Sequence, residues 1–90
     1  SHLQMVEATP LFSLPFRGNL IQLKNKLISA SGNSIVIRNG TDANIIREMR
    51  IFPKSKILFL FPIGEKNGEK AFLLAISPKR IALFKLKDSP

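Results

Sequence analysis

The sequence predicts a mainly β domain, a β-rich α+β fold built as a small antiparallel barrel or sandwich of five to six strands with one short helix near residues 42–51. Three observations point to this class. The apolar residues are mostly Ile and Leu, with seven Phe, and Ile and Phe favour strands. Turn residues separate these runs at short intervals. A chain of 90 residues has room for one domain with a single modest core.

The N-terminal residues are expected to lie outside the folded domain. Residues 1–10 are interpreted as a tag remnant and a flexible arm, because Ser1-His2 is typical of what remains after an affinity tag is removed. The binding domain is expected to span residues 11–88 as one unit. Pro10 and Pro15 limit the stretch between them to an edge strand, since proline cannot donate to a sheet ladder.

Residues 19–28 fit either of two elements. Their leucines and isoleucines recur at helical spacing, yet they also suit a strand that runs into a turn. The following residues favour the strand, because Gly32 and Asn33 tolerate the positive φ angles of a tight hairpin turn. The β-branched run at 35–37 suits the returning strand of that hairpin.

A short amphipathic helix is predicted after this hairpin. Asp42 offers a side-chain oxygen to cap its start, and Pro53 stops it. Between these ends, apolar residues recur at helical spacing: Ile45, Ile46, Met49 and Phe52. Arg47 and Arg50 lie on the opposite side of the helical wheel, so the helix is expected to present a basic outer face.

The final third predicts a three-stranded antiparallel meander. With Asn67-Gly68 at the first turn, two pairs of opposite charge face each other across the strands: Lys66 with Glu69, and Glu65 with Lys70. A second turn at residues 77–80 leads into the last strand. These strands are apolar on both faces near their middle, so the sheet needs cover on both sides. We expect the first hairpin on one face and the helix on the other.

Charge indicates the first functional hypothesis. The net charge is +8, and residues 46–90 carry ten basic side chains against four acidic ones. Such a field favours polyanions. We therefore expect a non-catalytic binding module that contacts the phosphate backbone of duplex nucleic acid. Stacking on single strands is not expected, because every aromatic residue is Phe within or near apolar runs. The candidate binding residues are Arg47, Arg50, Lys54, Lys56, Lys79 and Arg80.

The alternative hypothesis is a protein-interaction or oligomerisation domain of a larger protein. The chain has more Ile and Leu than so small a domain is expected to hide, and a terminal strand can pair with another chain. Its partner is then an acidic protein or a second copy in a homo-oligomer. The candidate interaction edge consists of alternate residues of the last strand: Ile81, Leu83, Lys85 and Lys87.

Catalysis, metal binding and cofactors are not expected. The chain has no Cys, and apart from His2 it has no histidine to act as a metal ligand or general base. The longest apolar run, at 57–63, is far short of the ~20 residues of a membrane helix, so integral membrane association is not expected. No secretory signal is visible, which indicates an intracellular location, nuclear or cytoplasmic.

Overall fold

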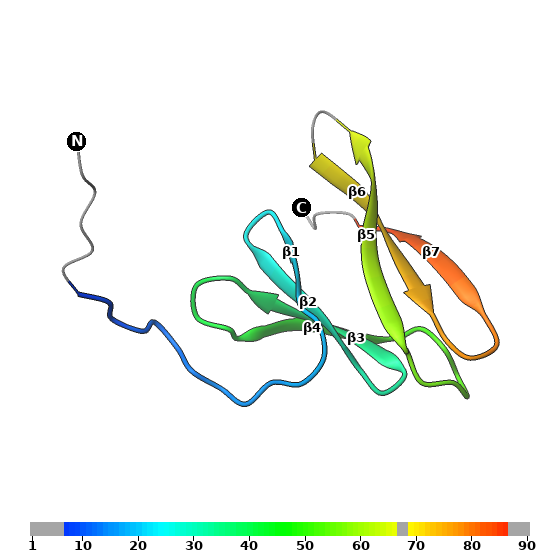
Figure 1. Cartoon of the computed structure of the whole chain (residues 1–90), viewed down its shortest axis with the longest axis horizontal. Helices are drawn as coiled ribbons and strands as arrows, with labels where there is room; N and C mark the ends of the chain where they lie inside the picture. Colours follow the sequence, from blue (N-terminus) through cyan, green and yellow to red (C-terminus); the bar gives the residue numbers. More distant parts are fainter. Residues whose placement is uncertain (1–6, 67–68, 87–90) are drawn as a thin grey trace.

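Two antiparallel sheets share one core in the computed structural model, which describes residues 7–66 and 69–86 (Figure 1). The four-stranded sheet has the order β1-β2-β3-β4 and comprises Ile21–Leu23, Lys26–Ser31, Ser34–Asn39 and Ile45–Arg50. The three-stranded sheet has the order β5-β6-β7 and comprises Phe59–Lys66, Glu69–Ile76 and Ile81–Lys85. The mainly β class is confirmed. Of the two expected architectures, barrel and sandwich, the closed barrel is not found, because these described strands leave both sheets open at their edges. The two described sheets together have seven strands, where five to six were expected.

The registers of two hairpins match the predicted ones. Gly32 adopts a φ of +61° in the turn between β2 and β3, a conformation that glycine reaches without strain. The turn sets Ser31 opposite Ser34. In the second sheet the backbone pairs match the predicted ones: Glu65 with Lys70, and Lys66 with Glu69. The Asn67-Gly68 turn itself lies outside the described residues.

The helix predicted near residues 42–51 is wrong. Residues Ile45–Arg50 form β4, and no helix occurs between residues 7 and 66 or between 69 and 86. An isolated helix of two to three turns is marginal in water. As a strand, the same residues pair antiparallel with β3 and satisfy backbone donors and acceptors along it. The long-range pairing therefore overrides the local helical pattern.

Residues expected to start that helix instead close the loop between β3 and β4. The backbone N–H of Asn39 donates to the carbonyl of Asn44 at 2.9 Å. Asp42 caps a turn rather than a helix, since its Oδ1 accepts from the N–H of Asn44 at 2.9 Å. Arg38 Nη1 donates to the carbonyl of Ala43 at 2.8 Å, and this hydrogen bond stabilises the loop.

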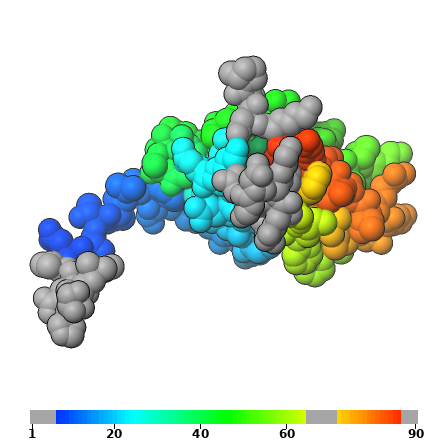
Figure 2. Space-filling model, turned by 90° about the horizontal axis from the view of Figure 1, so that it is seen from above, coloured from blue at the N-terminus to red at the C-terminus, as the bar shows by residue number. Residues whose placement is uncertain are grey.

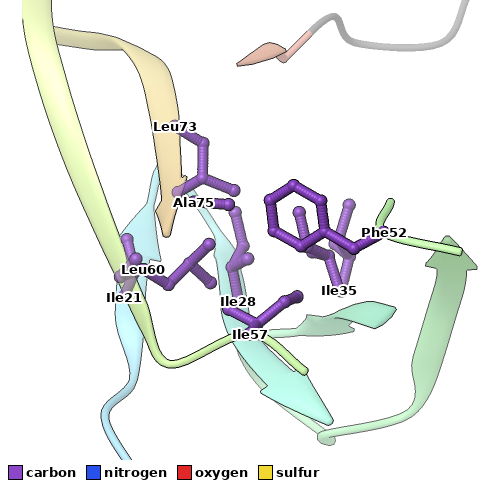
Figure 3. Close-up of a cluster of buried hydrophobic side chains, with 9 residues drawn as sticks. Ile21, Ile28, Ile35, Phe52, Ile57, Leu60, Leu73 and Ala75 are labelled. Atoms are coloured by element: carbon purple, nitrogen blue, oxygen red, sulfur yellow. The ribbon is translucent and has the colours of Figure 1, made fainter. Parts of the chain in front are cut away.

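The core lies between the two sheets, where the labelled side chains converge in Figure 3. The four-stranded sheet contributes isoleucines, and the three-stranded sheet contributes leucines and an alanine. The linker between the two sheets adds one phenylalanine and one isoleucine. These buried residues are Ile21, Ile28, Ile35, Ile37, Phe52, Ile57, Leu60, Leu73 and Ala75. Both sheets therefore bury one face against the other.

The segment before β1 does not join either sheet. Residues 7–20 form no strand, so the edge strand expected between Pro10 and Pro15 is absent. This segment leads away from the body on the side opposite to β5 and β7 (Figure 1 and Figure 2). At its base, Asn19 Nδ2 donates to the carbonyl of Leu60 at 3.1 Å. The segment therefore leaves the outer side of the three-stranded sheet uncovered.

Candidate interaction surface

The three-stranded sheet turns its second face away from the core. Strand pairing aligns the outward residues of this face in three rows across β5, β6 and β7. The rows are Phe59-Ile76-Ile81, Phe61-Leu74-Leu83 and Ile63-Phe72-Lys85. Eight of these nine residues are apolar, and the single charge, that of Lys85, lies at a corner. We call these nine residues the apolar face.

Most of the apolar face is open to solvent. On β7, Ile81 is 71% exposed and Leu83 is 56% exposed. On β5, Phe59 is 54% exposed and Phe61 is 42% exposed, and their rings stack with centroids 6.0 Å apart. The residues of β6 are half-buried, because strands flank them on both sides. Large apolar side chains therefore remain in water on a face that no segment within residues 7–66 and 69–86 covers.

The exposed area is large for a domain of this size. Five exposed residues of the apolar face carry on the order of 500 Å² of surface, taking about 200 Å² for a fully exposed large side chain. The largest apolar patch on a soluble monomer is typically about 300–600 Å², and patches of that size commonly mark binding sites. The apolar face is therefore a candidate binding surface.

A glycine shapes the third row of the apolar face. Gly64 adopts a φ of +72°, and a Cβ at this position would lie 2.7 Å from Cδ2 of Phe72. The ring of Phe72 therefore packs directly on the Gly64 backbone, as aromatic residues often do over strand glycines. Because the face is built on paired strands, its side chains are held in place before any partner arrives.

The candidate phosphate-binding residues are all exposed, but they do not share one face. Arg47 lies opposite Ile37, a core residue, whereas Arg50 lies opposite Ser34. Side chains alternate along a strand, so residues paired with Ile37 and Ser34 leave the sheet on opposite sides. The basic face expected from a helical wheel is therefore not formed by β4.

Two of the other basic candidates do come together. Lys54, in the linker, and Arg80, in the turn before β7, line one open groove of about 420 Å³. Ser77 holds that turn, since its Oγ accepts from the N–H of Arg80 at 3.0 Å. Lys56 and Lys79 are exposed elsewhere on the same linker and turn. The turn therefore places Lys79 and Arg80 immediately before Ile81, at the rim of the apolar face.

The predicted interaction edge forms one side of the apolar face. Ile81, Leu83 and Lys85 all point outward from β7, while Lys87 lies outside the described residues. The sequence does not indicate that Phe59 and Phe61 are exposed, because both sit in an apolar run that is equally typical of core residues. The useful indication was the meander itself, which is apolar on both faces.

Searches for other types of site and comparisons with known proteins do not indicate a second candidate site among the described residues. Within residues 7–66 and 69–86, no group of three or more side chains could hold a metal ion. No helix in those ranges is long and apolar enough to cross a membrane. The chain matches no protein-family model, and it has no significant match among curated proteins or solved structures.

Proposed function

We propose that the chain is a non-catalytic protein-interaction module and that the apolar face of β5, β6 and β7 is its binding surface. The observation that carries this proposal is the exposure of large apolar side chains in two neighbouring rows of one paired sheet, those that end at Ile81 and Leu83. Covering about 500 Å² of apolar surface contributes on the order of 10 kcal/mol before the costs of association are subtracted. This is enough to drive binding by a partner of matching shape.

The structure favours this function over contact with phosphate backbone. Phosphate contacts require several cations directed at one ligand surface. Arg47 and Arg50 leave β4 on opposite sides of the sheet, and the apolar face carries only Lys85. In the proposed function the remaining basic residues keep the chain soluble around its apolar surface.

An environment-sensitive dye tests whether the apolar face is open in the isolated chain. At low micromolar protein concentration we expect dye fluorescence to rise on binding, and we expect Leu83→Glu to remove most of that rise. Ile46→Glu is a matched control, because Ile46 on β4 is 52% exposed and Leu83 is 56% exposed. A dye response that is absent, or that both variants reduce equally, would contradict the proposed surface.

A further inference from the structure

We infer that the partner of the apolar face is a second copy of this chain, which packs face to face as a two-fold symmetric dimer. This inference rests on the proposed function, because it names the occupant of the same surface. The dimer would turn two open three-stranded sheets into a sandwich, with the interface as its interior.

Composition of the face favours a second copy over an unrelated partner. Interfaces between transient partners are about as polar as ordinary protein surface, whereas homodimer interfaces resemble a domain core cut in half. The apolar face has eight apolar residues and one charged residue. It offers no side-chain hydrogen-bonding group apart from Lys85. A partner that matches it must be almost wholly apolar, and the chain itself provides such a surface.

A two-fold symmetric dimer can accommodate the single charge of the apolar face, that of Lys85. When two sheets pack with their strands aligned, the two-fold axis runs either along the strands or across them. Both choices set Leu74, at the centre of the face, over Leu74 of the second copy. An axis along the strands sets Lys85 over Ile63 of the second copy, and an axis across the strands sets it over Ile81. The two lysines are kept apart, and each can extend its ammonium group to water.

The area is sufficient for a dimer. Two copies of the apolar face would bury on the order of 1,000 Å² from their exposed residues alone, with the half-buried residues of β6 adding to this, and specific interfaces begin near about 1,000–1,200 Å². A dimer of this size is expected to be reversible. It should therefore dissociate on dilution into the monomers that the dye experiment requires.

Net charge provides a test that separates a second copy from an acidic partner. Each copy carries a net charge of +8, so like charges oppose dimer formation. Salt screens this repulsion over a Debye length of about 8 Å at physiological ionic strength. Higher salt should therefore strengthen the dimer. An acidic partner or a nucleic acid would instead bind more weakly as salt increases.

Sedimentation velocity tests the dimer directly. The chain would be measured from about 5 to 300 µM protein at about 50 and 500 mM salt. We expect a monomer–dimer equilibrium whose Kd falls severalfold at the higher salt. Leu83→Glu should raise the Kd at least ~100-fold, because the carboxylate would be buried without a partner. Ile46→Glu should leave the Kd unchanged, and circular dichroism confirms that both variants fold.

The outcomes separate this inference from the proposed function. A monomer at every concentration that still binds dye through Leu83 overturns the dimer and leaves the interaction module standing. A monomer that binds no dye overturns both. A dimer that weakens with salt, or that Leu83→Glu leaves intact, also overturns the inference. In the last case the contact would lie elsewhere, for example on the exposed apolar residues of the segment before β1.

Discussion

The two sheets bury similar inner faces against each other, but the compositions of their outer faces differ. Outward positions of the four-stranded sheet form the rows Gln22-Leu27-Arg38-Ile45, Ser29-Val36-Glu48 and Ser31-Ser34-Arg50. Seven of these ten residues are polar, whereas one of nine is polar on the apolar face. Alternation of polar and apolar residues is typical of a sheet with one face in water. The four-stranded sheet has a mostly polar outer face, on which Ser29 and Val36 are buried, whereas the three-stranded sheet has the composition of an internal layer.

This difference between the sheets shows how a binding surface can be recognised in a protein without a known sequence motif. A sheet whose strands are apolar on both faces requires two covering layers. The four-stranded sheet supplies one layer, and no described segment supplies the other. The missing layer is therefore expected to come from another molecule. Four predictions, which use six substitutions, and one direct measurement test this difference between the sheets.

Adjacent residues of β6 should show the largest difference. Leu73 is fully buried on the inner face, whereas Leu74 is only half-buried on the apolar face. We expect Leu73→Ala to lower the free energy of unfolding by about 2–5 kcal/mol. Leu74→Ala should lower that of the monomer by roughly 1 kcal/mol or less. Urea denaturation at low protein concentration measures both, and equal losses would mean that the two faces are not different.

Gly64→Ala should have the next largest effect. The new Cβ would clash with the ring of Phe72, and the positive φ adds backbone strain. We expect a loss of about 2–4 kcal/mol in the free energy of unfolding. Gly32→Ala is the control, because its φ is also positive but nothing lies within 4 Å of the added Cβ. Its loss should stay near ~1 kcal/mol. If Gly32→Ala cost as much, Phe72 would not be packed on Gly64.

Ser77→Ala should have a smaller effect that is confined to the turn before β7. The Oγ of Ser77 accepts from the N–H of Arg80 and donates to its carbonyl at 3.2 Å, and the residue is buried. Removing these bonds should lower the free energy of unfolding by about 1–2 kcal/mol. Thermal denaturation measures the loss. A fully stable variant would show that the turn does not depend on Ser77.

Ile81→Thr should have the smallest effect on the isolated chain. Ile81 is 71% exposed, and Thr keeps the β-branched shape that suits a strand. The free energy of unfolding of the monomer should change by less than about 0.5 kcal/mol. Dye binding should fall, because the row that begins at Phe59 loses apolar surface. A large loss of stability would mean that Ile81 belongs to the core.

The sequence alone predicted those structural features that depend on residues close together in the chain. Gly32 sets the register of the first hairpin through local turn chemistry, and the strand residues Glu65 and Lys66 pair as predicted with Lys70 and Glu69 in the second sheet. Residues 45–50 were misassigned, because their apolar spacing fits one side of a helix and only pairing with the distant β3 makes them a strand. That error had two consequences. The predicted helix placed Arg47 and Arg50 on one face. The same helix was also expected to cover one face of the three-stranded sheet.

The candidate surface was therefore predicted only at its edge. Ile81, Leu83 and Lys85 follow from the alternation of one terminal strand. Phe59 and Phe61 could not be distinguished from core residues, because their exposure depends on which segments pack above the sheet. Composition indicates that a sheet needs two covers, but it does not indicate that the described residues provide only one of them.

Isotope-filtered nuclear Overhauser measurements on a mixture of labelled and unlabelled chain detect the face-to-face dimer directly. The dimer should give contacts between copies at Leu74, together with contacts from the methyl groups of Leu83. These would reach Phe61 if the two-fold axis runs along the strands, or Leu83 if it runs across them. The absence of contacts between copies, or contacts only at Ile45 and Ile46 on β4, would rule out a dimer through the apolar face.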